Sequence, residues 1–311
     1  MNSAKLSLPF PTYTGPTQPA LKQALGGCTT LFSAPAGYVP TSRLSGLLQE
    51  QQARVIWLRA GSEDGDPATF LISLANGAEG IFPGVGRCTL ERMRESPGPV
   101  FGWAPLFSGL ARDIGEAADG KPNLTLVIQH LGSLYTAPQT LAQLHDIFLP
   151  LLPVGISVIL ISHFPPARGT LPGYIVQITT RDLRMDEVGG LLLAENTIRE
   201  GGFAAPDKAF LPAPSLPMAS LRRMVALVEG CSSALIGLGT AYSWLGGSTF
   251  RQVIEAASGR VDLLARVARL CLQSNQQSLD ELLSLALCLG YLHPDLTQSA
   301  PGLQAFISDH L

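Results

Sequence analysis

The chain has 311 residues, of which 46% are hydrophobic and 14% charged, and its formal net charge is −3. This length suits about two domains of ordinary size, with a core large enough to need no disulfide or metal for stability. A protein that binds duplex nucleic acid usually carries a basic face that offsets the phosphate charge, and the sequence contains no basic block. We therefore expect no direct contact with nucleic acid.

Cysteine usage and hydropathy indicate the cellular compartment. The sequence has five widely spaced cysteines and no CxxC pair. Such thiols are typical of a reduced, cytosolic protein, and a zinc site would need ligand pairs close in sequence. The N-terminus has no long apolar segment, and no apolar stretch reaches the roughly 20 residues of a membrane span. We expect a soluble, cytoplasmic protein that holds no metal and contacts no membrane.

Short apolar segments alternate with segments of helical periodicity over the first 180 residues. Buried strands that alternate with helices predict an α/β fold with a parallel sheet covered on both faces. In chain order we expect a helix over residues 19–25, a strand over 29–33, a helix over 41–52, a strand over 55–58, a helix over 68–75, an irregular stretch over 77–105, a helix over 106–118, a strand over 124–128, a helix over 137–152, and strands over 156–162 and 174–178.

The pattern becomes helical after about residue 180, and it contains no internal repeat. We predict an α/β domain over residues 1–200 followed by a helical C-terminal domain over residues 201–311, for which a winged-helix arrangement is one alternative. The helices expected in this part cover residues 186–195, 221–228, 232–242, 250–273 and 279–289.

A segment placed like a phosphate-binding loop follows the first expected strand and precedes a helix. It reads A-P-A-G-Y-V-P-T-S over residues 34–42. A P-loop ends in Gly-Lys-Ser/Thr, because the glycine lets backbone N–H groups wrap phosphate, the lysine reaches the outer phosphates and the hydroxyl holds magnesium. Val39 and Pro40 stand where Gly-Lys belongs, and proline has neither an ammonium group nor an N–H to donate. The segment keeps the position of a P-loop between a strand and a helix, but it lacks the glycine and the lysine that bind phosphate.

Further blocks follow in order along the chain. The turn D-G-D-P-A-T-F over residues 64–70 follows the strand that ends in Trp57-Leu58, the expected strand at 124–128 is followed by Gln129-His130, and the strand at 156–162 is followed by His163. Together with the loop, these blocks resemble the STAND-class P-loop ATPases, and they are most similar to the ATPase module of large LuxR-type regulators such as the maltose regulon activator. The resemblance runs from about residue 15 to about residue 299.

The departures from this family lie at the strand ends. In the family the loop reads A-P-A-G-Y-G-K-T-T-L, the Walker B strand ends in two acidic residues, and the next strand ends in Ser-Arg, with the arginine near the phosphates. Here Gln129-His130 and Ser162-His163 occupy these strand ends. The resemblance therefore implies a P-loop NTPase-like parallel sheet with flanking helices and degenerate Walker motifs.

The same resemblance implies a vestigial nucleotide pocket with no catalytic residue and no metal site. Thr41 keeps a hydroxyl group, but Gln129 carries no charge and His163 replaces an arginine. Because both the carboxylates and the cations are lost, we expect no ATP hydrolysis and no required cofactor, and weak ATP binding stays open. The residues of this pocket are Gly37, Tyr38, Thr41, Ser42, Gln129 and His163.

Our interpretation is a pseudo-ATPase, that is, a catalytically inactive ATPase-like protein with a regulatory or scaffold role. It would act through contacts with a protein partner, and the resemblance points to transcriptional regulation. One alternative is a noncanonical nucleotide-binding ATPase switch that uses Lys22 or an arginine supplied in trans. Another is the N-terminal fragment of a DNA-binding transcriptional activator, whose helix-turn-helix would follow Leu311.

Overall fold

The computed structural model describes residues 17–35, 37–38, 41–95, 102–118, 123–167, 169, 171–199 and 216–273. Contacts divide the chain into two compact units. We call the first the sheet unit, which comprises Thr17–Pro35 and Thr41–Leu183, and the second the helical unit, which comprises the residues from Arg184 onward together with the loop residues Gly37 and Tyr38. The predicted boundary at residue 200 borders residues 200–215, which lie outside the described residues, and it stays a prediction.

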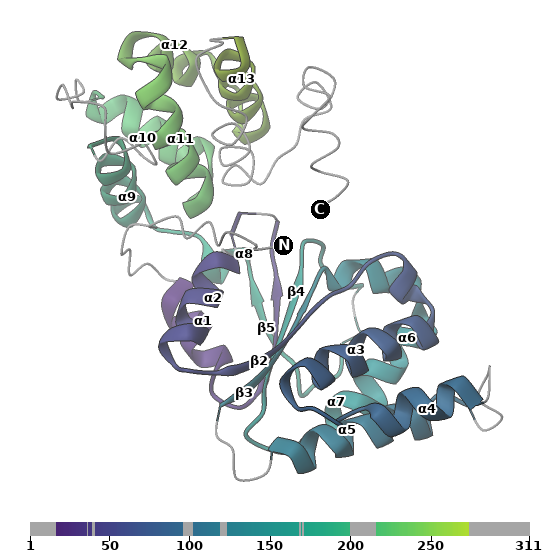
Figure 1. The fold of residues 1–311 in the computed structure, drawn as a ribbon. Coiled ribbons are helices and arrows are strands. Elements are labelled where there is room, and N and C mark those ends of the chain that lie inside the picture. Colours follow the sequence, from purple (N-terminus) through teal and green to yellow (C-terminus); the bar gives the residue numbers. More distant parts are fainter. Residues whose placement is uncertain are drawn as a thin grey trace. The chain divides into compact units, whose positions relative to one another are not determined.

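The sheet unit is built on five parallel strands (Figure 1). They are β1 (Thr29–Ser33), β2 (Arg54–Arg59), β3 (Leu124–Gln129), β4 (Ser157–Ser162) and β5 (Val176–Thr179). Their order is β2-β3-β4-β1-β5, and all neighbours pair in parallel. Every residue of the central strand β4 is buried, as expected for a parallel strand covered on both faces. The five strands expected from the sequence are all present.

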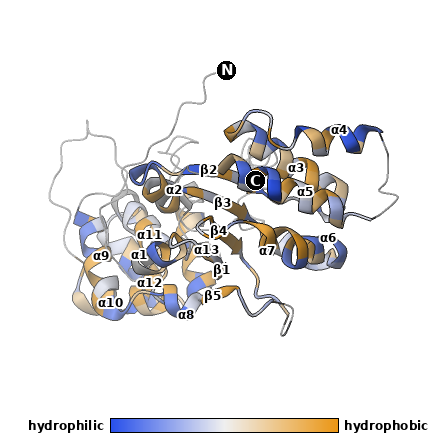
Figure 2. Cartoon of the chain, turned by 90° about the horizontal axis from the view of Figure 1, so that it is seen from below, coloured by the Kyte–Doolittle hydropathy of each residue, from blue (hydrophilic) through white to orange (hydrophobic). Residues whose placement is uncertain are grey.

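Helices cover both faces of this sheet (Figure 1; Figure 2). One face carries α1 (Thr17–Ala24) and α2 (Thr41–Glu50), and α8 (Thr180–Leu183) follows β5. The other face carries α3 (Pro67–Ile81), α4 (Arg87–Glu95), α5 (Ala104–Ala118), α6 (Pro138–Ala142) and α7 (Leu149–Leu151). The predicted α/β class, a P-loop NTPase-like parallel sheet with flanking helices and a helical part after it, is confirmed.

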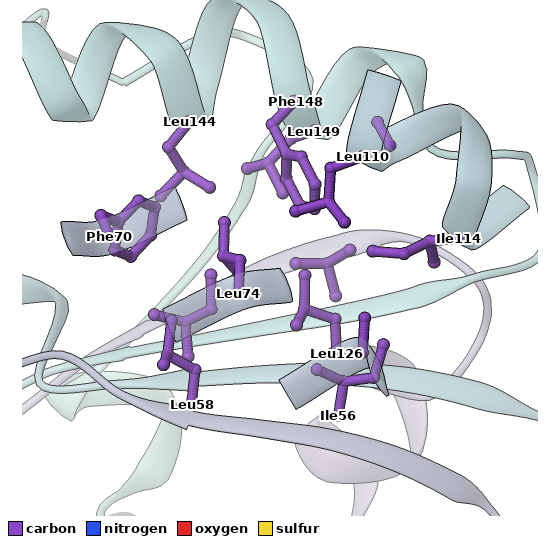
Figure 3. Close-up of a cluster of buried hydrophobic side chains, with 14 of the residues drawn as sticks. Ile56, Leu58, Phe70, Leu74, Leu110, Ile114, Leu126, Leu144, Phe148 and Leu149 are labelled. Atoms are coloured by element: carbon purple, nitrogen blue, oxygen red, sulfur yellow. The ribbon is translucent and has the colours of Figure 1, made fainter. Parts of the chain in front are cut away.

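A hydrophobic core of the sheet unit lies between the sheet and the helices of the α3 face. Figure 3 shows Ile56 of β2 and Leu126 of β3 below Leu74 of α3 and Leu110 of α5, and these four side chains are 0–2% exposed. Full burial of such an aliphatic side chain stabilises a fold by about 1.5–3 kcal/mol. Apolar packing against α3 and α5 therefore holds β2 and β3 in the sheet.

The described part of the helical unit contains helices alone. These are α9 (Glu187–Arg199), α10 (Met218–Leu227), α11 (Ser232–Leu245), α12 (Gly247–Ala256) and α13 (Arg260–Gln273). α11 packs closely on α9 at Gly239, where an added Cβ would clash with Thr197. The expected helix over 279–289 lies outside the described residues, so the winged-helix alternative stays a prediction. In the part of the chain that the structure describes, every helix is too short or too polar to cross a membrane.

The expectation of an irregular stretch over residues 77–105 is wrong, because α3 extends into it, α4 lies within it and α5 begins at Ala104. α3 continues through Gly77 and Gly80 to Ile81, and α4 follows after a short turn. A glycine inside a helix costs about 1 kcal/mol relative to alanine. A Cβ at Gly77, however, would lie only 3.2 Å from Cγ2 of Ile56. Glycine here allows close packing of α3 on β2 rather than marking a loop.

One of the two long helices expected from the sequence runs without a gap but contains a π-helical turn, and the other is broken. The segment 137–152 consists of α6, a π-helical turn over Gln143–Phe148 and α7. The segment 250–273 is divided between α12 and α13. At the second break the backbone N–H and the hydroxyl of Ser258 donate to Oδ2 of Asp262, at 2.9 and 3.0 Å. Local hydrogen bonds of this kind compete with helix continuation.

Substitutions at two positions of α3 test the assignment of its buried face. Leu74 is fully buried, whereas Ile72 is 40% exposed. Leu74→Ala is expected to lower the free energy of unfolding by about 2–5 kcal/mol, because truncation leaves a cavity. Ile72→Ala, the control, is expected to lower it by less than about 1 kcal/mol. Chemical denaturation followed by circular dichroism measures both losses, and equal losses would contradict the assignment.

Candidate functional site

The carboxyl ends of the parallel strands β1, β3 and β4 lie side by side at one end of the sheet, which we call the carboxyl edge. Ser33 of β1 pairs with Ser162 of β4, and the N–H of Ala34 donates to the carbonyl of Ser162 at 3.1 Å. On the other side of β4, β3 ends in Gln129 and is followed by His130. Ligands of open parallel sheets bind at the edge formed by the carboxyl ends of the strands. The residues at these strand ends therefore form the candidate site of the sheet unit.

Two histidines lie together at this edge. The ring centroids of His130 and His163 are 5.4 Å apart, and the ring planes are inclined by 58°. Burial, then the charge of Arg59 and then that of His163 lower the pKa of His130, so its imidazole is neutral at neutral pH. Among the described residues, Nδ1 of His163 has no hydrogen-bond partner although it is buried. The pair thus combines the neutral imidazole of His130 with one unsatisfied polar atom on His163.

The structure places the predicted pocket residues of the sheet unit as follows. Gln129 and His163 lie at the same edge, and the carbonyl of Gln129 accepts the N–H of Ala60 at 2.9 Å. Thr41 and Ser42 form the first turn of α2, and their side chains lie outside the described part. His130 was missing from the predicted pocket, although its position directly after Gln129 could have indicated it.

Gly37 and Tyr38, the other predicted pocket residues, belong to the helical unit. The Tyr38 side chain is 1% exposed, its hydroxyl donates to the carbonyl of Glu229 at 3.1 Å, and the guanidinium carbon of Arg260 lies 5.2 Å from the ring centroid. Burial is the main cause that raises the pKa of Tyr38, so the hydroxyl remains a donor. Gly37 has φ 92°, and a Cβ there would lie 3.0 Å from Sγ of Cys231. The tyrosine side chain therefore anchors this part of the loop.

The acidic turn after β2 has a structural role. Asp64 is 3% exposed, and its carboxylate accepts hydrogen bonds from the N–H of Gly61 at 2.7 Å and from the hydroxyl of Ser73 at 2.9 Å. Asp66 is the N-cap of α3 and accepts the N–H of Thr69 at 3.0 Å. Aspartate is favoured at this position because its carboxylate satisfies an unpaired N–H of the first helical turn. Turn formation and helix capping therefore account for both carboxylates.

Lys22 lies near the amino ends of the strands, at the end of the sheet opposite the candidate site. It is exposed in the last turn of α1, just before the chain enters β1 at its amino end. There the N–H of Gly27 donates to the hydroxyl of Ser157, the first residue of β4, at 3.1 Å. A five-residue strand spans about 16 Å, which exceeds the reach of a lysine side chain. Lys22 does not reach the strand ends where the alternative mechanism would need it.

The π-helical turn buries a third histidine. His145 is 3% exposed, and its Nε2 has no hydrogen-bond partner among the described residues. The hydroxyl of Tyr174 donates to the carbonyl of His145. Burial lowers the pKa of His145, and the neighbouring carboxylate of Asp146 opposes this effect only in part. Burial, followed by the charge of Asp146, raises the pKa of Tyr174 to about 12. Both side chains are therefore uncharged at neutral pH.

The strand order defines the class of this protein, a P-loop NTPase-like α/β fold. No protein-family model and no curated protein matches the chain. The solved structures similar to it include a DNA replication initiation factor, with 10% identity over 94% of this chain and 88% of that chain and a TM-score of 0.40. Drosophila ORC bound to DNA is similar with 11% identity over 94% of this chain and 85% of that chain, and a TM-score of 0.43. C. elegans PCH-2 is similar with 12% identity over 82% of this chain and 64% of that chain, and a TM-score of 0.29. Similarity at this level assigns neither a family nor a function.

Asp64→Ala tests the structural role of the acidic turn. The substitution leaves the N–H of Gly61 and the hydroxyl of Ser73 without their acceptor, so it is expected to lower the free energy of unfolding by about 1–3 kcal/mol. Glu63→Ala, at the exposed neighbouring position, is the control and should change stability by less than about 0.5 kcal/mol. Urea denaturation measures both, and a fully stable Asp64→Ala protein would refute this role.

The pH dependence of stability tests the buried histidine. Because the pKa of His145 is lower in the folded chain than in the unfolded chain, the unfolded state binds the additional proton. The free energy of unfolding should therefore fall as the pH drops below about 6.5 and through the folded pKa, by at most about 1.4 kcal/mol per pH unit for this group. His130 contributes in the same direction. Denaturation between about pH 8 and pH 5 should show a shallower slope for His145→Asn, and an identical slope would count against this prediction.

Proposed function

We propose that this chain is a cytoplasmic pseudo-ATPase that acts in regulation, or as a scaffold, through contacts with a protein partner. The observation that carries the proposal is the identity of the residues at the ends of β3 and β4. Gln129 ends β3 and is followed by His130, and Ser162 ends β4 and is followed by His163. The resemblance stated above implies carboxylates and an arginine at these positions in an active relative.

The residues present are poorly suited to phosphoryl transfer. Magnesium prefers oxygen ligands, normally a P-loop hydroxyl and a carboxylate, and catalysis consists almost entirely of positioning and charge stabilisation. The amide of Gln129 is uncharged, and the lowered pKa of His130 leaves that ring neutral. Pro40 supplies no ammonium group for the outer phosphates. The motif positions therefore supply neither a carboxylate for magnesium nor the lysine that reaches the outer phosphates, and the positive charge at this end of the sheet that acts on His130 comes from Arg59 of β2.

The contacts of Tyr38 support the proposal independently. A phosphate-binding loop is normally wrapped around its ligand by backbone N–H groups. Here the buried tyrosine ring and its hydrogen bond to Glu229 fix Gly37 and Tyr38. The conformation of these two residues is therefore fixed without a bound phosphate. This is consistent with a protein that does not cycle between nucleotide states.

An exposed apolar pair on α9 supports a role in protein contacts. Val188 and Leu192 are 66% and 54% exposed, and residues four positions apart share one face of a helix. Exposed apolar groups that are adjacent favour association with an apolar surface. We propose this face of α9 as a contact for the protein partner, with transcriptional regulation as the process that the sequence resemblance suggests.

Calorimetric titration with ATP and magnesium tests the loss of nucleotide chemistry. The full chain is expected to show no binding in the micromolar range, and phosphate release should stay at the rate of the buffer control, because the strand ends lack the required charges. Micromolar binding together with measurable phosphate release would refute the proposal.

A variant with restored motif residues is the matched control for this titration. Val39→Gly, Pro40→Lys and Gln129→Asp return the loop glycine, the lysine and one carboxylate to the sequence positions of the family motif. The triple variant is expected to bind ATP with magnesium at least about tenfold more tightly than the unsubstituted chain. A gain of this kind shows that the assay detects binding and that the missing side chains are the cause.

A further inference from the structure

Strand β2 is the outermost strand on one side of the sheet, where it pairs with β3 alone. We call its outward side the β2 edge. The N–H of Arg54 donates to the carbonyl of Asn123 at 2.9 Å, and the N–H of Ala60 donates to the carbonyl of Gln129 at 2.9 Å. Alternate residues of a strand bond the same neighbour. The even-numbered residues of β2 therefore face β3, and the backbone groups of the odd-numbered residues point outward.

The outward residues of the β2 edge are Val55, Trp57 and Arg59. In the part of the chain that the structure describes, the backbone N–H and C=O groups of Val55 and Trp57 have no hydrogen-bond partner. A row of unpaired backbone groups on an edge strand is a template with which a further extended segment pairs. The β2 edge thus offers main-chain donors and acceptors to a partner.

The side chains of the β2 edge add a specific surface. Ile56 and Leu58 belong to the core under α3, so Val55, Trp57 and Arg59 project to the opposite face of the sheet. The Trp57 side chain is 36% exposed, Val55 is half-buried and Arg59 is exposed. Aromatic side chains stabilise a strand pair by packing on apolar cross-strand neighbours. Trp57 is the natural contact for an apolar residue of an added strand.

Two arginines determine the charge of the β2 edge. Arg54 and Arg59 stand at the two ends of β2, and both are exposed. The guanidinium carbon of Arg54 lies 5.7 Å from the ring centroid of Phe82. A second copy of β2 would bring two further arginines to the same ladder, and like charges oppose such pairing. An acidic segment, in contrast, is complementary at both ends of the strand.

We propose that the β2 edge binds an extended, acidic segment of a partner protein, which adds to the sheet as a further strand. The main chain of that segment bonds Val55 and Trp57, an apolar side chain packs on Trp57, and carboxylates lie near Arg54 and Arg59. The proposal rests on the proposed function for the existence of a protein partner. Its site lies wholly in the sheet unit, so ATP binding in the calorimetric titration above would refute the pseudo-ATPase role and leave the β2 edge unaffected.

Amide hydrogen exchange of the full chain, followed by nuclear magnetic resonance, tests the site with two synthetic peptides. The acidic peptide E-E-T-V-Y-V-T-E-E reads the same in both directions, so it allows parallel and antiparallel addition, and in the control peptide lysine replaces each glutamate. At saturation the acidic peptide is expected to slow the exchange of the Val55 and Trp57 amides at least about tenfold, because each gains an acceptor. The lysine peptide should bind at least about tenfold more weakly.

Substitution of Val55 separates strand addition from other binding. Val55→Pro removes an outward N–H but no bond to β3, and proline is tolerated at such edge positions. It is expected to weaken binding of the acidic peptide at least about tenfold, whereas Val55→Thr, the matched control that keeps the N–H, should stay within about twofold.

The exchange measurement on the unsubstituted chain decides the matter if Val55→Pro fails to fold. The proposal is overturned if the acidic peptide leaves the Val55 and Trp57 amides in fast exchange, if the lysine peptide binds equally tightly, or if folded Val55→Pro keeps full affinity. Slowed exchange of both amides, with loss of affinity in Val55→Pro and not in Val55→Thr, supports it.

Discussion

The pairing of β4 with β1 on one side and with β3 on the other is the constraint on which the rest of the structure depends. All residues of β4 are buried, and a slip of one residue would turn every side chain of the strand to the opposite face. This register also decides which residues reach the carboxyl edge. It places Ser162 beside Ser33, and it places Gln129 and His130 at the same edge. The composition of the site therefore follows from the packing of the strands.

The core and the edge of this sheet are subject to different physical demands. Side chains such as Ile56 and Leu126 stabilise the fold by leaving water. Side chains at the strand ends contribute little apolar burial, so they can be substituted while the sheet keeps its strand order. Asp64 has a structural role in its turn, because the N–H of Gly61 and the hydroxyl of Ser73 donate to its oxygens. These hydrogen bonds are reason enough for a carboxylate at this position.

The sequence predicts the strands well and the long-range contacts poorly. The apolar run Val158–Ile161 can belong only to a buried segment, and its length and bounding serines favour a strand. The helix α4 could not be predicted in the same way, because the glycines and prolines around it are equally typical of a loop. The contact of Tyr38 with Glu229 spans 191 residues and depends on tertiary packing. Sequence alone places His130 and His163 at strand ends, but their ring separation depends on the left-handed backbone at His130.

A nucleotide switch can shift a conformational equilibrium only by the difference in affinity that its ligand has for the two states. In an ATPase, the γ-phosphate and magnesium supply that difference. On our proposal this chain has little to offer either group, since the side chain of Tyr38 already anchors its part of the loop and no carboxylate stands at the motif positions at the ends of β3 and β4. Any signal transmitted by this fold would then depend on contacts with a partner surface, and not on phosphate hydrolysis.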